Sequence, residues 1–265
     1  MSRRLRLDAE LVRRGLARSR DQAADLIAAG RVAIGGQVAA KPASQVPTDA
    51  PITVTENNDE PGYVSRGGTK LAGALAAFRG LTVAGKRCLD AGASTGGFTD
   101  VLLRAGALHV VAVDVGYGQL AWSLRSDERV TALDRVNVRS LRPEQVAPPP
   151  ELVVADLSFI SLTLVLPALV ACSAPDADFL VMVKPQFEVG KDLVRGGVVR
   201  DPALRSAAVA GVAAAAADLG LGAEGVTASP LPGPSGNVEY FLWLRRGAAP
   251  LDNDALVSAV AAGPQ

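Results

Sequence analysis

Histidine and cysteine are almost missing from this sequence of 265 residues. It contains one histidine, His109, and two cysteines, Cys88 and Cys172, and each lies in or beside an apolar run where a packing role is expected. Two cysteines cannot form a disulfide framework or a four-cysteine zinc site, and one histidine largely excludes multi-histidine metal sites and His-based triads. We therefore expect no metal, and we expect proton transfer to use Lys, Asp, Glu or Tyr.

Long hydrophobic runs are also missing. The two most apolar stretches are residues 206–223, which are rich in alanine and predict a packed helix, and residues 161–174, which Pro167 interrupts. Neither reaches the roughly 18 uninterrupted apolar residues of a membrane span. The first ten residues lack the apolar core of a signal peptide. These features predict a cytoplasmic protein with no membrane contact.

Charge is balanced overall but unevenly distributed. The formal net charge is zero, yet residues 1–41 contain nine basic and four acidic residues. Such a bias favours a basic module for a polyanion, although a solvated charged face would look the same. Within this stretch we expect a helix capped by Asp8 and stopped by Gly15, a second helix from Ser19 to Gly30, and a short strand pair over 31–42.

The stretch "RLDAELVRRGLARSRDQAADLIAAGRVAIGGQVAAKP" resembles an S4 RNA-binding domain. The chain would then divide into an α+β S4 domain at residues 1–55, a linker at 56–65 and a larger domain at 66–265. Guanidinium groups bind phosphate well, and A-form RNA is recognised mainly through its shape and backbone. The resemblance implies that five residues contact RNA, namely Arg4, Arg6, Arg18, Arg20 and Lys41.

From residue 66 onward, short apolar runs alternate with helical stretches. The runs that predict strands are 87–92, 109–116, 129–133, 151–158 and 178–185. This alternation is typical of a parallel sheet covered on both faces. Residues 222–246 instead predict two strands joined by a Pro/Gly loop. By analogy of fold, a doubly wound α/β sheet with a terminal antiparallel hairpin indicates a Rossmann-like class I methyltransferase of seven strands.

The glycine-rich loop after the first strand indicates which cofactor is bound. Its spacing, Gly92-x-x-x-Gly96-Gly97, does not fit the G-x-G-x-x-G of dinucleotide-binding folds. Asp90 would repel a pyrophosphate but suits a cation, which favours S-adenosylmethionine, with its sulfonium and ammonium groups, over NAD. The residues expected to bind the cofactor here are Asp90, Gly92, Ser94, Gly96 and Gly97.

Later strand ends supply further candidates for cofactor binding. Asp114 ends the second strand, where a carboxylate is expected to bind ribose hydroxyls. Asn137 follows the third strand and either meets the adenine edge or serves as a turn residue. Asp156 lies near the end of the fourth predicted strand and is expected to position the methyl donor.

Charged residues among apolar or glycine neighbours indicate the reaction. They are Lys70, Asp156, Lys184 and Glu239. A ribose hydroxyl must lose its proton as it attacks a methyl group, and burial beside a second ammonium group favours the neutral lysine that could accept it. We expect Lys184 to accept the proton and Lys70 to hold the oxygen, with Asp156 and Glu239 orienting them. Structural ion pairs at strand ends are the alternative.

At these residues the chain resembles the TlyA (haemolysin A) family of FtsJ-like rRNA ribose 2′-O-methyltransferases. The matching motifs include "RGGTKL", "DAGASTGGFTDVLL", "VVADLSFIS", "VKPQFEVGK" and "SPLPGPSGNVEYF". The resemblance implies a Lys–Asp–Lys–Glu tetrad and, in actinobacterial members, methylation of cytidine in 16S and 23S rRNA. Those members carry Arg-Ala-Trp-Val in the linker, where this chain has "PGYV" at 61–64.

Three further basic residues flank the predicted pocket and could continue the RNA-binding surface, namely Arg66, Arg135 and Lys191. Each could equally be an ordinary surface charge. We expect a monomer that acts on ribosomal RNA. The alternatives are a pseudouridine synthase, which would not need the cofactor loop, a non-catalytic ribosome assembly factor, and a membrane-active haemolysin.

Overall fold

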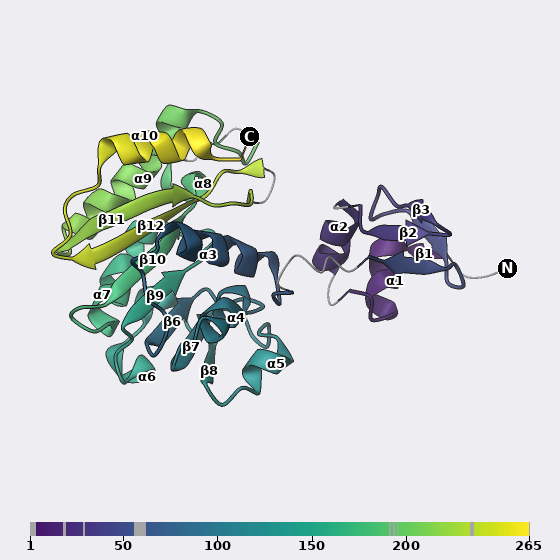
Figure 1. Ribbon diagram of the computed structural model, residues 1–265, viewed down its shortest axis with the longest axis horizontal. Helices are drawn as coiled ribbons and strands as arrows, with labels where there is room; N and C mark the ends of the chain where they lie inside the picture. Colours follow the sequence, from purple (N-terminus) through teal and green to yellow (C-terminus); the bar gives the residue numbers. More distant parts are fainter. Residues whose placement is uncertain are drawn as a thin grey trace. The chain divides into compact units, whose positions relative to one another are not determined.

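The computed structural model describes residues 4–17, 20–28, 30–55, 62–190, 192, 194, 196–233 and 236–264. Contacts divide the chain into two compact units, Met1–Gly62 and Tyr63–Gln265 (Figure 1). Of the predicted linker, residues 56–61 lie outside the described part. The backbone N–H of Val64 donates to Asp100 of the second unit at 2.9 Å, so residues 63 and 64 pack with that unit.

The N-terminal unit consists of two short helices against two small antiparallel sheets. One sheet pairs β1 with β4, and the other has the order β3-β2-β5. Its small core includes Leu7, Leu11 and Ile27. Its elements are β1 (Arg4–Arg6), α1 (Leu7–Arg13), α2 (Arg20–Ala28), β2 (Val32–Ile34), β3 (Gln37–Val38), β4 (Gln45–Pro47) and β5 (Ile52–Val54).

The predicted cap of the first helix is wrong. Helix α1 begins at Leu7, and Arg6 precedes it without a side-chain cap. Asp8 lies inside the first turn, where its carboxylate is buried and bound to Arg6 and Arg20. The Asp8 side chain therefore binds two arginines and does not cap the helix. Gly15 and Gly30 both have positive φ angles after the helices, as expected of stop residues, whereas Ser19 lies outside the described residues.

The second unit is a seven-stranded sheet covered by helices. Its strands are β6 (Arg87–Ala91), β7 (His109–Asp114), β8 (Val130–Asp134), β9 (Leu152–Ala155), β10 (Asp178–Val183), β11 (Leu221–Ala228) and β12 (Tyr240–Arg246). Its α-helices are α3 (Arg66–Ala77), α4 (Gly97–Arg104), α5 (Trp122–Arg125), α6 (Pro143–Val146), α7 (Leu166–Cys172), α8 (Pro185–Glu188), α9 (Pro202–Ala217) and α10 (Asn253–Ala262). Two short 3-10 turns span Val138–Ser140 and Leu162–Leu164.

The strand order is β11-β12-β10-β9-β6-β7-β8. Strands β6 to β10 pair with one another in parallel, and β12 runs antiparallel to both β10 and β11. The chain proceeds from β6 toward β8 and then returns to start again at β9, on the other side of β6. The sheet is therefore doubly wound with a terminal hairpin, as the sequence predicted, and its topological switch point lies between β6 and β9.

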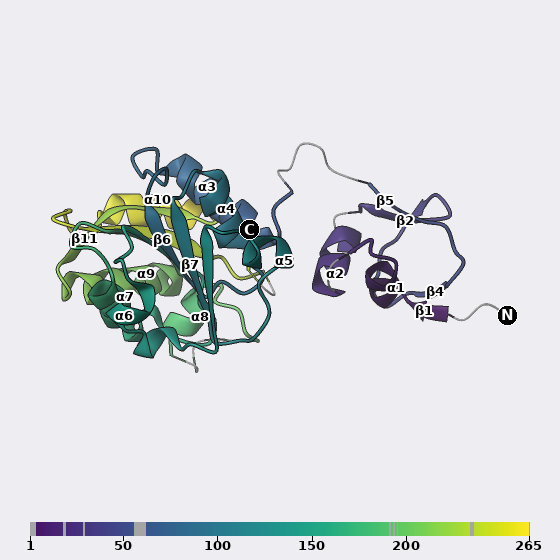
Figure 2. The same cartoon turned by 90° about the horizontal axis from the view of Figure 1, so that it is seen from below.

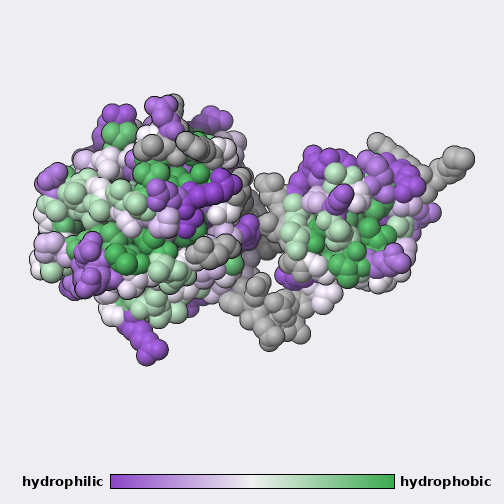
Figure 3. Space-filling model, turned by 90° about the horizontal axis from the view of Figure 1, so that it is seen from above, coloured by the Kyte–Doolittle hydropathy of each residue, from purple (hydrophilic) through white to green (hydrophobic). Residues whose placement is uncertain are grey.

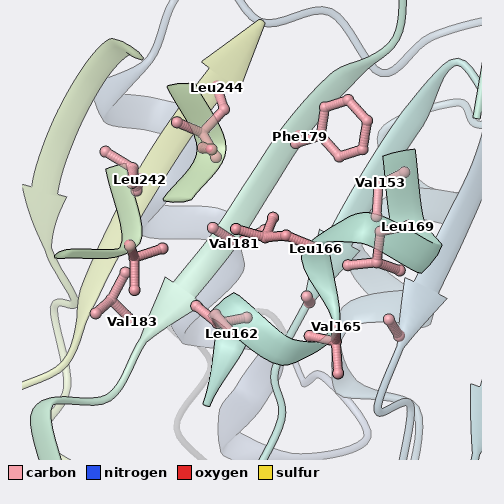
Figure 4. Packing of buried hydrophobic residues seen from close by; sticks show 14 of the residues in the cluster. Val153, Leu162, Val165, Leu166, Leu169, Phe179, Val181, Val183, Leu242 and Leu244 are labelled. Carbon is pink, nitrogen blue, oxygen red and sulfur yellow. The ribbon is translucent and has the colours of Figure 1, made fainter. Parts of the chain in front are cut away.

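Helices cover both faces of this sheet (Figure 2). On one face of the sheet, α3, α4 and α5 share a core with Cys88 and Val110. On the other face, α6, α7, α9 and α10 share a core with Leu89 and Val111. Figure 4 shows the second of these cores, in which Val181 and Leu242 of the sheet meet Leu162 and Leu166. Both faces of the strands are thus buried, which explains their almost unbroken apolar runs.

The observed ends of one helix and one strand differ from the predicted ones. The alanine-rich helix was expected at 206–223, but α9 spans Pro202–Ala217, the chain turns at Gly220 with a φ of 80°, and β11 begins at Leu221. Alanine favours helix locally, yet pairing with β12 determines the end of that stretch. The fourth strand stops at Ala155, before the polar turn that follows it. Among the described residues, no helix has both the length and the hydrophobicity needed to cross a membrane.

Candidate active site

Parallel strands deliver charged residues to one edge of the sheet. Asp90 lies in β6, Asp114 ends β7, Asp156 follows β9 and Lys184 follows β10. Because these four strands are parallel, their carboxyl ends meet at the same edge, around the switch point between β6 and β9. Open α/β sheets bind their ligands at this position.

The glycine-rich turn after β6 can be built only with glycine at key positions. Gly92 has a φ of 87°, and a Cβ there would lie 2.5 Å from the carbonyl oxygen of Asp156. Gly96 has a φ of 98°, and a Cβ would lie 2.3 Å from Leu124. Ser94 also has a positive φ, of 48°, and its N–H donates to Asp114 at 2.8 Å. The turn is therefore held tightly between the ends of β7 and β9.

Asp90 is buried beneath this turn. One carboxylate oxygen accepts a 2.7 Å hydrogen bond from Thr99, and the other has no hydrogen-bond partner among the described residues. Burial raises the pKa of Asp90 to about 7. A carboxylate in this state gains from a nearby cation. Because the Asp90 side chain is buried under the turn, we expect its negative charge to attract a bound cation across the turn and not to line an open surface.

Lys184 and Asp156 form the first of two ion pairs. Their Nζ and Oδ1 atoms are 2.6 Å apart, although the angles fall outside those of a hydrogen bond. The same ammonium group donates to the hydroxyl of Ser158 at 3.1 Å. Lys184, which lies between β10 and α8 in the chain, is buried. Asp156 is partly exposed.

Lys70 and Glu239 form the second ion pair. Lys70 Nζ of α3 donates to Glu239 Oε2 at 2.5 Å, and both side chains are buried. The other oxygen of Glu239 has no partner in the part of the chain that the structure describes. A Cβ on Gly233 would lie 2.2 Å from that oxygen, so the absence of a side chain at 233 makes room for the carboxylate.

Strand pairing joins the two ion pairs. Val183 of β10 is registered with Tyr240 of β12 in an antiparallel ladder. One step further along this ladder, Lys184 follows Val183 and Glu239 precedes Tyr240, so the two residues face each other across neighbouring strands. The structure thus shows two ion pairs, Lys70–Glu239 and Lys184–Asp156, which involve residues that adjoin the paired ends of β10 and β12.

Neither cysteine is suited to nucleophilic catalysis. Cys88 is buried in β6, and burial raises the pKa of its thiol to about 12. Cys172 is buried at the end of α7, and burial raises its pKa as well. A thiol must ionise to attack a base, so both side chains are better explained by core packing.

Comparison with known proteins identifies the family of this fold. The sequence profile of the FtsJ-like methyltransferases matches residues 63–246, and that of the S4 domain matches residues 5–52. The chain belongs to the FtsJ-like methyltransferase family. The predicted class I methyltransferase fold with an N-terminal S4 domain is therefore confirmed.

Relatives within this family cover the whole chain. The 16S/23S rRNA (cytidine-2′-O)-methyltransferase TlyA of Mycobacterium tuberculosis is 61% identical over 100% of both chains. A Bacillus subtilis protein, YqxC, named as a proposed rRNA methyltransferase, is 43% identical over 92% of this chain and 86% of its own. A solved Streptococcus thermophilus structure, named as a proposed hemolysin, is 36% identical with a TM-score of 0.78, covering 98% and 96% of the two chains.

Asp114 and Asn137, two further predicted cofactor residues of the FtsJ-like domain, also have partners inside the chain. Asp114 accepts N–H groups from Ser94 and Gly116, at 2.8 and 2.7 Å, while staying partly exposed. Asn137 accepts the N–H of Arg139 at 3.0 Å and so caps the 3-10 turn that follows it. The capping bond favours the turn role that the sequence left open for Asn137.

The predicted RNA-binding residues occupy different settings. Arg4 and Lys41 are exposed, and Arg4 donates to the carbonyl of Gln45 at 2.9 Å. Arg6 and Arg20 share the carboxylate of Asp8. Two more are exposed in the second unit: Arg66 donates to the carbonyl of Pro232, and Arg135 stacks on Tyr117 with 4.3 Å between guanidinium carbon and ring centre. Arg18 and Lys191 lie outside the described residues.

Sequence reasoning missed an exposed aromatic side chain in the turn that contains Asp156 and Ser158. Phe159 follows Asp156 and Ser158, has a φ of 64°, and is 91% exposed. Its ring lies 5.2 Å from that of Phe187 in α8. Glu188 of the same helix accepts from the hydroxyl of Ser161 at 2.5 Å and from the N–H of Leu162 at 2.8 Å. A phenylalanine within the polar turn "DLSFIS" was the available signal.

Proposed function

We propose that this protein is an S-adenosylmethionine-dependent 2′-O-methyltransferase that acts on cytidine in 16S and 23S ribosomal RNA. The observation that carries the proposal is the pairing of two buried lysines with two carboxylates at the ligand-binding edge of an FtsJ-like domain. The proposed substrate is that of the Mycobacterium tuberculosis methyltransferase TlyA, which is 61% identical over the full chain. An enzyme acting on ribosomes would work in the cytoplasm.

The residues around the turn after β6 fit S-adenosylmethionine. Asp90 has a buried carboxylate oxygen without a partner among the described residues. The turn that contains Gly92 and Gly96 lies close to the ends of the strands, since a Cβ on Gly92 would meet the carbonyl oxygen of Asp156. Asp114 stays partly exposed where ribose hydroxyls would be bound. When bound, S-adenosylmethionine would supply a methyl group on positively charged sulfur. Asp90 and Asp156 would favour that cationic ligand over a dinucleotide, whereas Asp114 would suit the ribose of either.

The chain's own contribution to the reaction is to activate and hold a sugar hydroxyl. In its neutral form, Lys184 Nζ would accept the proton of the 2′-hydroxyl, while the ribose oxygen bonds to the methyl carbon and the carbon–sulfur bond of the donor breaks. Lys70 Nζ would donate a hydrogen bond to that oxygen. Asp156 and Ser158 hold the Lys184 side chain, and Glu239 holds Lys70, so that neither lysine must be ordered during the reaction.

RNA recognition would be divided between the two units. We propose an S4 domain at residues 1–55, a linker at 56–65 and a catalytic domain at 66–265. The N-terminal arginines would bind the phosphate backbone, and Arg66 and Arg135 would add contacts from the catalytic domain. Phe159, exposed beside Asp156, offers a ring on which an unstacked base can stack.

The decisive test is methyl transfer from labelled S-adenosylmethionine to separated, unmethylated 30S and 50S subunits, followed by mapping of 2′-O-methyl positions. Lys184→Ala should reduce methyl transfer at least a hundredfold. Lys86→Ala is the matched control, because Lys86 also forms a partly buried ion pair, with Asp178 at 2.7 Å, at the opposite end of β10. It should remain active.

Three results would contradict the proposal. Label found on a base would refute the ribose assignment. A fully active Lys184→Ala protein would refute the proposed proton acceptor. Absence of transfer to either subunit by the unmodified protein, with S-adenosylmethionine bound, would favour an RNA-binding assembly factor that lacks catalysis.

A further inference from the structure

A single buried carboxylate holds two arginines in the N-terminal unit. Asp8 Oδ1 accepts from Arg6 Nε at 3.0 Å, and Asp8 Oδ2 accepts from Arg6 Nη2 at 2.8 Å and Arg20 Nη2 at 2.9 Å. The side chain of Asp8 is only 6% exposed, whereas those of Arg6 and Arg20 are 45% and 58% exposed. The acid is thus covered, and each guanidinium group keeps a face toward solvent.

Arg6 and Arg20 come from different elements. Arg6 ends β1, and Arg20 begins α2, so their alignment depends on the residue between them. The Arg6 hydrogen bonds hold the pKa of Asp8 far below its ordinary value, with a second contribution from Arg20. Asp8 therefore stays charged at any pH at which the protein works. In the space-filling view this unit has hydrophilic side chains along much of its outline around an apolar patch (Figure 3).

A second buried acid in the same unit makes a different arrangement. Glu10 accepts from Arg13 at 2.6 Å and from Arg14 at 2.7 Å. The remaining Arg14 nitrogens donate to the carbonyls of Thr48 and Ala50, at 2.9 and 2.7 Å. Glu10 therefore holds Arg14, whose donors are used inside the fold, and Arg13, which is 54% exposed but is not a predicted RNA contact. Asp8 instead holds two predicted RNA contacts that both keep accessible donors.

We propose that Asp8 is a positioning residue for RNA binding, which aligns Arg6 and Arg20 so that they engage the RNA backbone together. This inference rests on the proposed function, in which those arginines contact RNA. A planar guanidinium group has donors left for phosphate after pairing with a carboxylate. Arginine side chains that are already ordered lose less freedom on binding, and this saving appears as affinity.

The sign of one substitution separates this idea from plain electrostatics. Asp8→Asn removes one negative charge from the unit, so charge alone predicts tighter binding to RNA. Positioning predicts the opposite, because asparagine presents an amide N–H₂ where the guanidinium groups need an acceptor. We expect Asp8→Asn to weaken binding of the full-length protein to 50S subunits about tenfold, which corresponds to about 1.4 kcal/mol.

The experiment measures dissociation constants for purified 50S subunits and, separately, the methylation rate at saturating subunit concentration. Asp8→Asn should raise the dissociation constant and KM, with kcat within twofold of the unmodified protein. Glu10→Gln is the matched control, since it makes the same charge change in the same unit. It should not weaken binding, and Asp8→Glu, which keeps the carboxylate, should recover part of the lost affinity.

A double-mutant cycle excludes a purely structural role. Arg6→Gln combined with Arg20→Gln should weaken binding, and adding Asp8→Asn should then change the dissociation constant by less than twofold. An equal loss in both backgrounds would overturn the proposal, as would tighter or unchanged binding by Asp8→Asn. If the double arginine variant binds normally, the positioning idea fails while the methyltransferase proposal survives; if the unmodified protein does not bind subunits, the proposed function itself fails.

Discussion

Replacement of Asp90 by asparagine should stabilise the ligand-free protein while impairing its use of the cofactor. Burial, as the largest cause, raises the pKa of Asp90 from 3.8 to about 7. Each unit corresponds to about 1.4 kcal/mol, so keeping this carboxylate charged in the folded state costs about 4 kcal/mol at pH 8. Asparagine removes that cost.

The gain is partly offset. One Asp90 oxygen binds Thr99, which the amide oxygen can replace, but the other has no described partner, and an amide N–H₂ there would be unsatisfied. An unsatisfied buried donor costs roughly 1–3 kcal/mol. We therefore expect Asp90→Asn to raise the free energy of unfolding by about 1–3 kcal/mol at pH 8.

The pH dependence has a definite sign. Between about pH 4 and pH 7 the folded protein keeps a proton on Asp90 that the unfolded chain loses, so rising pH destabilises the folded state across that window. The asparagine variant should lack this part of the dependence, and the advantage of the variant should shrink toward pH 5.

Urea denaturation at pH 5 and pH 8 measures the effect. Both tryptophans, Trp122 and Trp243, lie in the second unit, so tryptophan fluorescence reports on that unit alone. Calorimetry with S-adenosylmethionine should show affinity rising with pH toward about 7 in the unmodified protein and no such rise in the variant. An Asp90→Asn protein that is less stable than the unmodified one at pH 8 would refute this reasoning.

Four further substitutions or conditions test other parts of the molecule. Gly92→Ala should abolish cofactor binding in calorimetry, because a side chain at φ 87° would meet a backbone carbonyl at 2.5 Å. Glu239→Gln should lower the free energy of unfolding by roughly 3–5 kcal/mol in urea titrations, because it leaves the buried Lys70 cation unpaired. Phe159→Ala should reduce single-turnover methylation at least tenfold with an unchanged melting temperature, since its ring is 91% exposed. Arg13, followed by Arg14, lowers the pKa of Glu10 to about 2, so its stabilising contribution is complete above about pH 4.5 and is lost as pH falls toward 2; amide NMR signals of residues 4–55 should report that loss, and Glu10→Gln should abolish this part of the pH dependence.

The sequence predicted the sheet well because its signals are local and strong. Apolar runs separated by helices predicted β6, β7, β8, β9 and β10, and the Pro/Gly interruption predicted the terminal hairpin. The end of α9 was misplaced because the alanine-rich run was extended through residues 218–223, although Gly220, with a φ of 80°, is a local stop signal. Strand pairing with β12, a contact distant in sequence, decided that boundary.

The predicted active-site residues illustrate the same limit. Strand ends predicted that Asp156 and Lys184 would lie at one edge, yet no local pattern shows that Lys184 pairs with Asp156 and Lys70 with Glu239. Likewise, the charge of the first 41 residues indicated a basic module, but not that Asp8 would leave the helix cap to bind two arginines. The partners of a side chain depend on tertiary packing, and neither the hydrophobic periodicity nor the composition of a sequence shows that packing.

The distribution of buried charge is itself an argument about function. Asp90, Lys70, Lys184 and Glu239 are all buried at or near the carboxyl edge of the sheet, while the two faces of the sheet are apolar. Buried ion pairs are commonly no more stabilising than apolar residues of the same size. Stability alone therefore gives no reason to collect them at one edge. Activation of a sugar hydroxyl beside a cationic methyl donor supplies that reason. It needs two lysines that are paired with carboxylates and held in place before the substrate arrives.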